Sequence, residues 1–134
     1  MIYNKENLEI VSKVILDNLT PDLLPKKWRE RNSLTPSFGH CHTASACLQK
    51  VFGTKNIKLQ RALDDEEMWH WWCIDIDGKR IDLTSDQYFN FNRTPPYDQG
   101  ERVGMLGWSY KTRVLTLLDR VQKILSTKDY VPTD

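Results

Sequence analysis

A glycine two residues before a cysteine, followed at once by an apolar helical pattern, is the feature that most constrains this chain. From residue 41 the apolar residues recur at helical spacing, and Gly53 follows them as a natural helix end. The pattern predicts a helix over Cys41–Phe52 that begins just after the loop breaker Gly39. A thiol at residue 41 would lie on the first turn, where free backbone N–H groups and the helix dipole favour a thiolate. Cys41 is therefore a candidate nucleophile, and the alternative is the buried hydrophobic role common for free cysteines.

A histidine and an aspartate follow Cys41 in the chain order nucleophile, base, carboxylate. Residues 68–76 alternate in the manner of a strand that carries His70, and the strand returning from the next turn leads to Asp82. Cys41 could attack a carbonyl carbon as a thiolate, with His70 as general base and acid and Asp82 holding its tautomer. The alternatives are a core histidine at position 70 and a strand-end carboxylate at position 82 that pairs with a neighbouring cation.

The hairpin between the two strands tests this triad. A two-residue turn at 77–78 would place His70 and Asp82 on opposite faces of the sheet, because a one-residue change of register turns a side chain over. A three-residue loop or a glycine bulge restores the same face. The triad therefore requires an irregular hairpin. Asp75 or Asp86 would be the orienting group if Asp82 were not.

Five tryptophans are many for 134 residues, and three of them surround His70. Such a cluster forms either a thick core or an aromatic-walled groove. Trp72 shares the His70 face of the strand, so we expect it to be structural, with Trp71 or Trp69 nearer to solvent or to the groove. Residues His40, His42, Trp71, Trp72 and Gln87 are the candidates for the oxyanion site and the groove. Backbone N–H groups of residues 41 and 42 would also stabilise an oxyanion.

The remaining periodicities predict a mixed α+β order, with helices before and after a small antiparallel sheet. The expected elements are a helix over 4–19, a short helix over 22–28, a loop over 29–38, a strand over 56–63, an acidic turn over 64–67, a returning strand over 80–83, a capping box over 84–87, a long lid-like surface loop over 90–107 and a helix over 112–125. We expect one domain over 1–134, with residues 126–134 as a frayed tail.

Composition limits the function classes. Nineteen basic and 18 acidic residues leave a net charge of +1, which gives no reason to expect nucleic acid or a membrane as partner. Three cysteines argue against a closed disulfide framework, and with no leader or membrane span in the sequence we expect a cytoplasmic protein. The cysteine and histidine spacings disfavour zinc, because His70 and Cys73 would point to opposite faces of one strand. Cys47 falls in the apolar stripe of its helix, so we expect it to be a core residue. We therefore expect no metal and no cofactor.

Four segments resemble a known family, the small bacterial proteins called YunG-like. The segments similar to the family pattern are Gly39-His40-Cys41, His70-Trp71-Trp72, the turn Asp77-Gly78 and the block from Ile81 to Tyr88, with the sequence Ile-Asp-Leu-Thr-Ser-Asp-Gln-Tyr. The resemblance covers about residues 28–125 and departs from the pattern at His40, where the family has Gln. It implies a papain-like cysteine peptidase fold, in which a nucleophile-bearing helix packs on a small antiparallel sheet.

The residues and the resemblance together predict a cysteine hydrolase or acyltransferase that acts on an amide or peptide bond through Cys41, His70 and Asp82. Peptidase, amidase, deamidase and transamidase reactions all belong to this class. We expect a peptide or protein as the substrate or partner. The alternative function is a catalytically silent binding or inhibitory module that keeps the fold and uses the aromatic groove beside His70.

Overall fold

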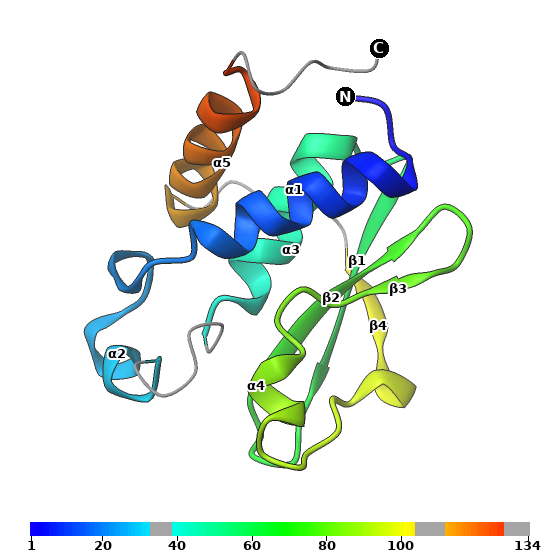
Figure 1. Ribbon diagram of the computed structural model, residues 1–134. Coiled ribbons are helices and arrows are strands. Elements are labelled where there is room, and N and C mark those ends of the chain that lie inside the picture. Colours follow the sequence, from blue (N-terminus) through cyan, green and yellow to red (C-terminus); the bar gives the residue numbers. More distant parts are fainter. Residues whose placement is uncertain (33–38, 104–111, 128–134) are drawn as a thin grey trace.

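Helices packed beside an antiparallel sheet form the protein, which is α+β (Figure 1). The computed structural model describes residues 1–32, 39–103 and 112–127. Three helices, α1 (Lys5–Asp17), α3 (Cys41–Phe52) and α5 (Thr112–Leu125), pack against one another. Helix α3 also contacts the two central strands of the sheet, so it connects the helical group to the sheet (Figure 1). The first turn of α3 therefore lies next to the strands that carry the predicted site.

The sheet in the described residues has four strands in the order β3-β2-β1-β4, and every neighbouring pair is antiparallel. The strands are β1 (Ile57–Leu63), β2 (Trp69–Asp75), β3 (Arg80–Ile81) and β4 (Glu101–Val103). Because β3 is only two residues long, it pairs with the far half of β2, and no described strand pairs with the start of β2 on that side. This gap is where the first turn of α3 comes close to β2.

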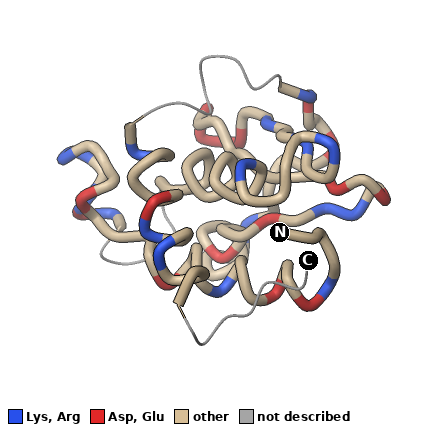
Figure 2. The backbone as a smooth tube through the Cα atoms, turned by 90° about the horizontal axis from the view of Figure 1, so that it is seen from above, with Lys and Arg blue, Asp and Glu red and all other residues tan. Residues whose placement is uncertain are grey.

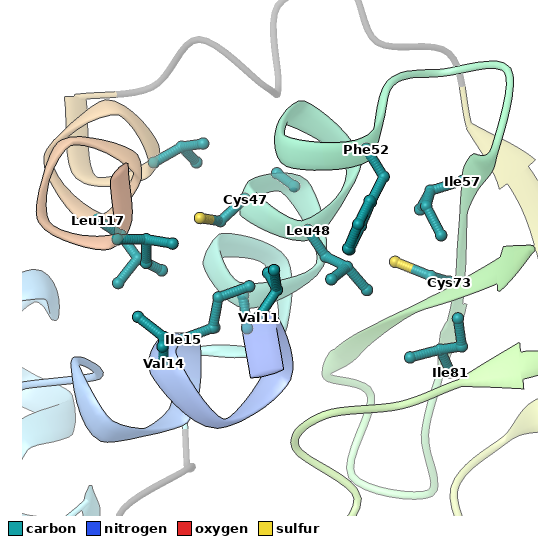
Figure 3. Packing of buried hydrophobic residues seen from close by; sticks show 14 of the residues in the cluster. Val11, Val14, Ile15, Cys47, Leu48, Phe52, Ile57, Cys73, Ile81 and Leu117 are labelled. Atoms are coloured by element: carbon teal, nitrogen blue, oxygen red, sulfur yellow. The ribbon is translucent and has the colours of Figure 1, made fainter. Parts of the chain in front are cut away.

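The core lies between the helical group and the sheet, as Figure 3 shows. Apolar side chains from α1, α3 and α5 meet the inward face of the sheet, including Trp71 and Cys73 of β2. Cys47 is fully buried between α3 and α5, which confirms its predicted place in the core (Figure 3). Trp72 points to the opposite face of β2 and is also fully buried, because aromatic residues from the segments after β3 cover it.

Several predicted elements agree with the structure. Helices α3 and α5 have the predicted bounds, and α1 begins after Asn4, whose side-chain oxygen accepts a hydrogen bond of 2.8 Å from the Asn7 amide. Gly53 follows α3 with φ +87°, a conformation that glycine adopts easily. Residues 57–63 and 69–75 form the two long strands.

Other expectations were wrong. Helix α2 runs over Lys26–Asn32, because Pro25 begins its first turn instead of limiting it, and a single 3₁₀ turn precedes it. The predicted loop over 29–38 therefore starts later, and its last six residues lie outside the described residues. In contrast, the helical turn expected from the capping-box spacing over 84–87 is confirmed by the short helix α4 (Asp86–Phe89). The two ends of the expected box are joined by a hydrogen bond of 3.0 Å from the Gln87 side-chain amide to the Thr84 hydroxyl.

The predicted loop over 90–107 contains a 3₁₀ turn, η2 (Tyr97–Gln99), and the edge strand β4. Its last four residues, 104–107, lie outside the described residues, as do residues 128–134 of the frayed tail expected over 126–134. No helix in the described part is long and apolar enough to cross a membrane. Basic and acidic residues alternate around the backbone tube in Figure 2, so the view shows no face of a single charge sign.

Candidate active site

Gly39 allows α3 to begin at Cys41. Its φ of +82° is unfavourable for other residues, and a Cβ atom built there would lie 2.9 Å from Leu24 and 3.0 Å from Trp28. The tight turn brings Cys41 beside the start of β2, where its Sγ lies 3.7 Å from the carbonyl oxygen of Trp69. Cys41 is 8% exposed, so little of the residue contacts solvent.

The β2–β3 hairpin places Asp82 on the face of the sheet that carries His70. Cys73 pairs with Ile81, and the Asp75 amide donates to the Lys79 carbonyl, so three residues form the loop. Gly78 in this loop has φ +82°. This is the irregular hairpin that the triad requires, since continuing the register puts Asp82 diagonally next to His70.

His70 and Asp82 form a close buried pair. The Nε2 atom of His70 lies 2.6 Å from Oδ2 of Asp82, and the two side chains are 0% and 5% exposed. The same carboxylate accepts hydrogen bonds from the Tyr97 hydroxyl at 2.8 Å and from the Thr84 amide at 3.2 Å. Because a carboxylate only accepts, Nε2 of His70 must be the donor. Nδ1 is then the ring nitrogen left to take a proton.

The surroundings of His70 stabilise its charged form. Burial by itself lowers the pKa of His70, but hydrogen bonds with Asp82 and with the Cys41 thiol, and the negative charge of these groups, raise the pKa to about 9. Tyr88 packs edge-on to the imidazole with ring centroids 4.6 Å apart, and Trp72 stacks on it at 5.7 Å. The cysteine, the histidine and the aspartate that the sequence singled out are thus brought together.

A small pocket opens beside Cys41. Its cavity volume is about 20 Å³, which is room for about one water molecule. The lining residues come from α2, the turn before α3, the β1–β2 turn and the α4 region: Trp28, Arg31, Gly39, Cys41, Asp64, Met68, Trp69, Gln87, Tyr88 and Arg93. The pocket combines an apolar part with charged groups of both signs.

Of the other predicted site residues, Gln87 lies in the pocket, whereas His42, Trp71 and Trp72 are buried. Gln87 lines the pocket, and its side-chain Nε2 lies 3.4 Å from Nδ1 of His70 and 3.0 Å from the hydroxyl of Thr84. His42 packs edge-on to Trp71 with centroids 4.6 Å apart, and both are buried. Trp72 is fully buried as well, so Trp71 and Trp72 form no open groove beside His70. Trp69 is the exposed member of the cluster.

His40 is buried behind the nucleophile. Its imidazole is fully buried, and neither ring nitrogen has a hydrogen-bond partner in the described part of the chain. Burial, reinforced by the positive charge of Arg113, lowers the pKa of His40 to about 4. The imidazole is therefore neutral at pH 7, and His40 contributes to the site through the backbone that begins α3.

Asp82 is the carboxylate bonded to His70, whereas the two alternatives lie elsewhere. Asp75 stabilises the hairpin by accepting from the amides of Asp77 and Lys79 and from the Tyr3 hydroxyl. Asp86 is the first residue of α4.

Sequence reasoning missed Tyr97 and Tyr88 as neighbours of the histidine. Tyr97 comes from a stretch interpreted as a surface loop, and it packs on Trp72 while donating to Asp82. Tyr88 donates to Asp64, which was interpreted as part of a solvated turn. Tyr88 belongs to the family pattern as the aromatic residue after Gln87, and this was the one sequence signal that could have placed it near the site.

The fold and the site define a class: a small α+β protein in which the cysteine at a helix start lies beside a histidine–aspartate pair of an antiparallel sheet. The chain belongs to the YunG family, because the sequence profile described as YunG protein matches residues 9–126. No curated protein and no solved structure gives a significant match.

Proposed function

We propose that the protein is a cysteine hydrolase or acyltransferase that cleaves an amide or peptide bond through Cys41, His70 and Asp82. The observation that carries the proposal is the buried imidazole of His70, which Asp82 holds at 2.6 Å and whose pKa the neighbouring Cys41 thiol also raises. A core histidine without function has no need of a buried anionic partner on one nitrogen and a neighbouring thiol that raises its pKa. The order of nucleophile helix, strand histidine and carboxylate supports a papain-like fold.

The reaction follows from the protonation states. His70 accepts the thiol proton at Nδ1, and the Cys41 thiolate attacks the carbonyl carbon to form a tetrahedral oxyanion. Collapse breaks the C–N bond, and the leaving amine takes the proton from Nδ1. Water, or an acceptor amine in the transferase case, then attacks the thioester while His70 takes its proton, and the thiol returns to Cys41. Asp82 keeps the Nε2 proton in place throughout.

Donors for the oxyanion are close to the nucleophile. The amides of Cys41 and His42 belong to the first turn of α3, where backbone N–H groups lack helical acceptors. Gln87 faces the same pocket and offers a side-chain amide, whereas the imidazole of His40 is buried away from it. We propose Gln87 and the helix-start amides as the oxyanion site.

The pH dependence of Cys41 alkylation by iodoacetamide tests the proposal. An ordinary thiol becomes reactive near pH 8.5, and a thiolate stabilised by the His70 imidazolium becomes reactive well below that value. The His70→Ala variant should move the rise up toward about 8.5. The Asp82→Asn variant should give a smaller shift in the same direction, since the imidazolium loses its partner. Asp86→Asn makes the same charge change on α4 and should leave the profile unchanged.

A silent binding module is the rival function, and the small size of the pocket and the low exposure of Cys41 favour it. A module without turnover needs no coupling between the thiol and the imidazole. Superimposable profiles of the wild type, His70→Ala and Asp82→Asn, all rising near the ordinary thiol pKa, would overturn the catalytic proposal and favour a binding role.

A further inference from the structure

Two arginines from separate segments line the pocket that contains Cys41, and both bond to one glutamate. Arg31 lies on α2 and Arg93 lies after α4. Glu66, in the β1–β2 turn, contacts Arg31 through one carboxylate oxygen at 3.2 Å and Arg93 through the other at 3.3 Å. Three segments far apart in sequence therefore meet through a single carboxylate, which bonds to two pocket-lining arginines but does not itself line the pocket.

Arg93 is held in place without Glu66. Its guanidinium also bonds to Asp65, lies 3.5 Å from the buried carboxylate of Asp64 and stacks over the ring of Tyr88 at 4.9 Å. Its side chain is 20% exposed. A cation fixed in this way loses little entropy when it binds an anion, which is the condition for a preorganised subsite.

Glu66 is the weak member of the arrangement. Its side chain is 44% exposed, that of Arg31 is 48% exposed, and exposed ion pairs contribute little. The next residue, Glu67, has a φ of +59°, which is unusual for a residue with a side chain and keeps the turn in a strained conformation. An incoming carboxylate can replace Glu66 between the two arginines, because it offers the same pair of oxygens.

We propose that Arg31 and Arg93 form a carboxylate-binding subsite beside Cys41, and that Glu66 occupies this subsite when no ligand is bound. The substrate would be an amide or peptide with a free carboxylate near the bond that Cys41 attacks, either a chain-terminal carboxylate or an Asp or Glu side chain. Trp28, Met68 and Trp69 supply apolar contacts for the rest of the ligand. The substrate part of the inference rests on the proposed function of Cys41, whereas the carboxylate site stands by itself.

Binding of small carboxylates, followed by the emission of the pocket tryptophans, tests the subsite without any turnover. Acetyl-leucine is compared with acetyl-leucinamide for a chain-terminal carboxylate, and acetyl-glutamic acid α-amide with acetyl-glutamine amide for a side-chain carboxylate. Each acid should bind the wild type more tightly than its neutral amide if its type of carboxylate fits. Arg31→Gln should weaken the preferred acid about tenfold, which corresponds to the loss of one charge-assisted contact. Arg29→Gln, on the same helix with its side chain bonded to the Pro21 carbonyl, should bind as the wild type does.

The glutamate variants give the sharper result. Glu66→Gln removes the internal competitor and should tighten binding of the preferred acid about threefold, in line with the strength of an exposed ion pair. Glu67→Gln makes the same charge change in the same turn and should have a much smaller effect. Equal binding of both acids and their amides, or weaker binding in Glu66→Gln, would overturn the subsite. Carboxylate binding together with an ordinary pH profile for Cys41 alkylation would support the subsite and reject the catalytic proposal. A shifted alkylation profile without any preference for carboxylates would support the catalytic proposal and reject the subsite.

Discussion

Two buried histidines lie close to the same cysteine and have opposite acid–base properties. His70 has an anionic partner at Nε2, and its pKa is raised to about 9 despite burial. His40 has no bonded partner in the described residues, and its pKa is lowered to about 4 mainly by burial. Burial disfavours the charged imidazole in both cases, so the neighbouring carboxylate decides the sign. Of the two, only His70 can store a positive charge beside a thiolate at neutral pH.

We predict that His40 makes the protein sensitive to acid. The pKa of His40 is lower in the folded state than in the unfolded state, where it is about 6.5, so the unfolded state binds the proton first as pH falls. The free energy of unfolding should therefore decrease from pH 6.5 to pH 4, by roughly 3 kcal/mol from this residue. His40→Gln, which introduces the residue of the family pattern, should flatten that decrease. Urea unfolding at a series of pH values measures it, and parallel curves for the two proteins would contradict the prediction.

At the scale of the elements, two glycines with the same backbone conformation are required for different reasons. Gly39 and Gly78 both have a φ of +82°. A Cβ atom at Gly78 would meet nothing within 4 Å, whereas at Gly39 it would meet Leu24 and Trp28. Gly78 needs only conformational freedom, and Gly39 also needs the absence of a side chain.

The pair therefore makes a matched experiment. Gly78→Ala should destabilise the protein by about 1 kcal/mol, the typical cost of a left-handed conformation for a residue with a side chain. Gly39→Ala should cost a further 1–3 kcal/mol or so, because the buried Leu24 must move. Because Gly39 precedes the nucleophile, Gly39→Ala should also change the alkylation rate of Cys41, while Gly78→Ala should not. Urea melts and timed alkylation measure both effects, and equal destabilisation by the two variants would refute the packing argument.

Long, periodic elements could be predicted from the sequence, and short or tertiary ones could not. The bounds of α3 and α5 follow from apolar spacing and a terminal glycine, which are local signals. Strand β4 has three residues, two of them charged, and it exists because β1 offers an open edge, which no local pattern reveals. Pro25 was interpreted as a limit to a helix, although proline is also favoured at a helix start.

The candidate site shows the same division. Cys41, His70 and Asp82 were predicted together, because the order of residue types and the same-face requirement restrict the choice. Tyr97 could not be predicted, since its contact with Asp82 depends on how the segment before β4 crosses the sheet. Trp72 was predicted as structural, and it is fully buried. In the described part of the chain, Tyr88 packs on His70 and Tyr97 packs on Trp72, so these two rings occupy the face on which an open groove was expected.

At the scale of the whole molecule, the three cysteines lie at two depths. Cys41 is partly accessible, whereas Cys47 and Cys73 are 0% and 1% exposed on the two sides of α3. Burial raises the pKa of Cys47 to about 12 and raises that of Cys73 further. Modification of Cys47 therefore requires α3 and α5 to separate, and modification of Cys73 requires α3 to separate from the sheet.

We predict that iodoacetamide labels Cys41 first in the native protein and labels Cys47 and Cys73 only on global unfolding. Along a urea series, the labelling midpoints of the two deep cysteines should coincide with the midpoint of the circular dichroism signal, because one cooperative core protects both. Mass spectrometry of digested samples gives the extent at each thiol. Early labelling of Cys47 or Cys73 in native buffer would show that the core opens locally and would remove the basis for singling out Cys41.

The three-residue loop of the β2–β3 hairpin has a consequence for how this family can diverge. Between Asp75 and Lys79, one inserted or deleted residue would turn Asp82 to the helix side of the sheet and remove it from His70. An exchange of Ile76 or Asp77, both at the tip, leaves the spacing intact. We expect relatives that retain the cysteine and the histidine to vary in the sequence of this loop but not in its length. An insertion or deletion in the loop would mark relatives that have lost the site.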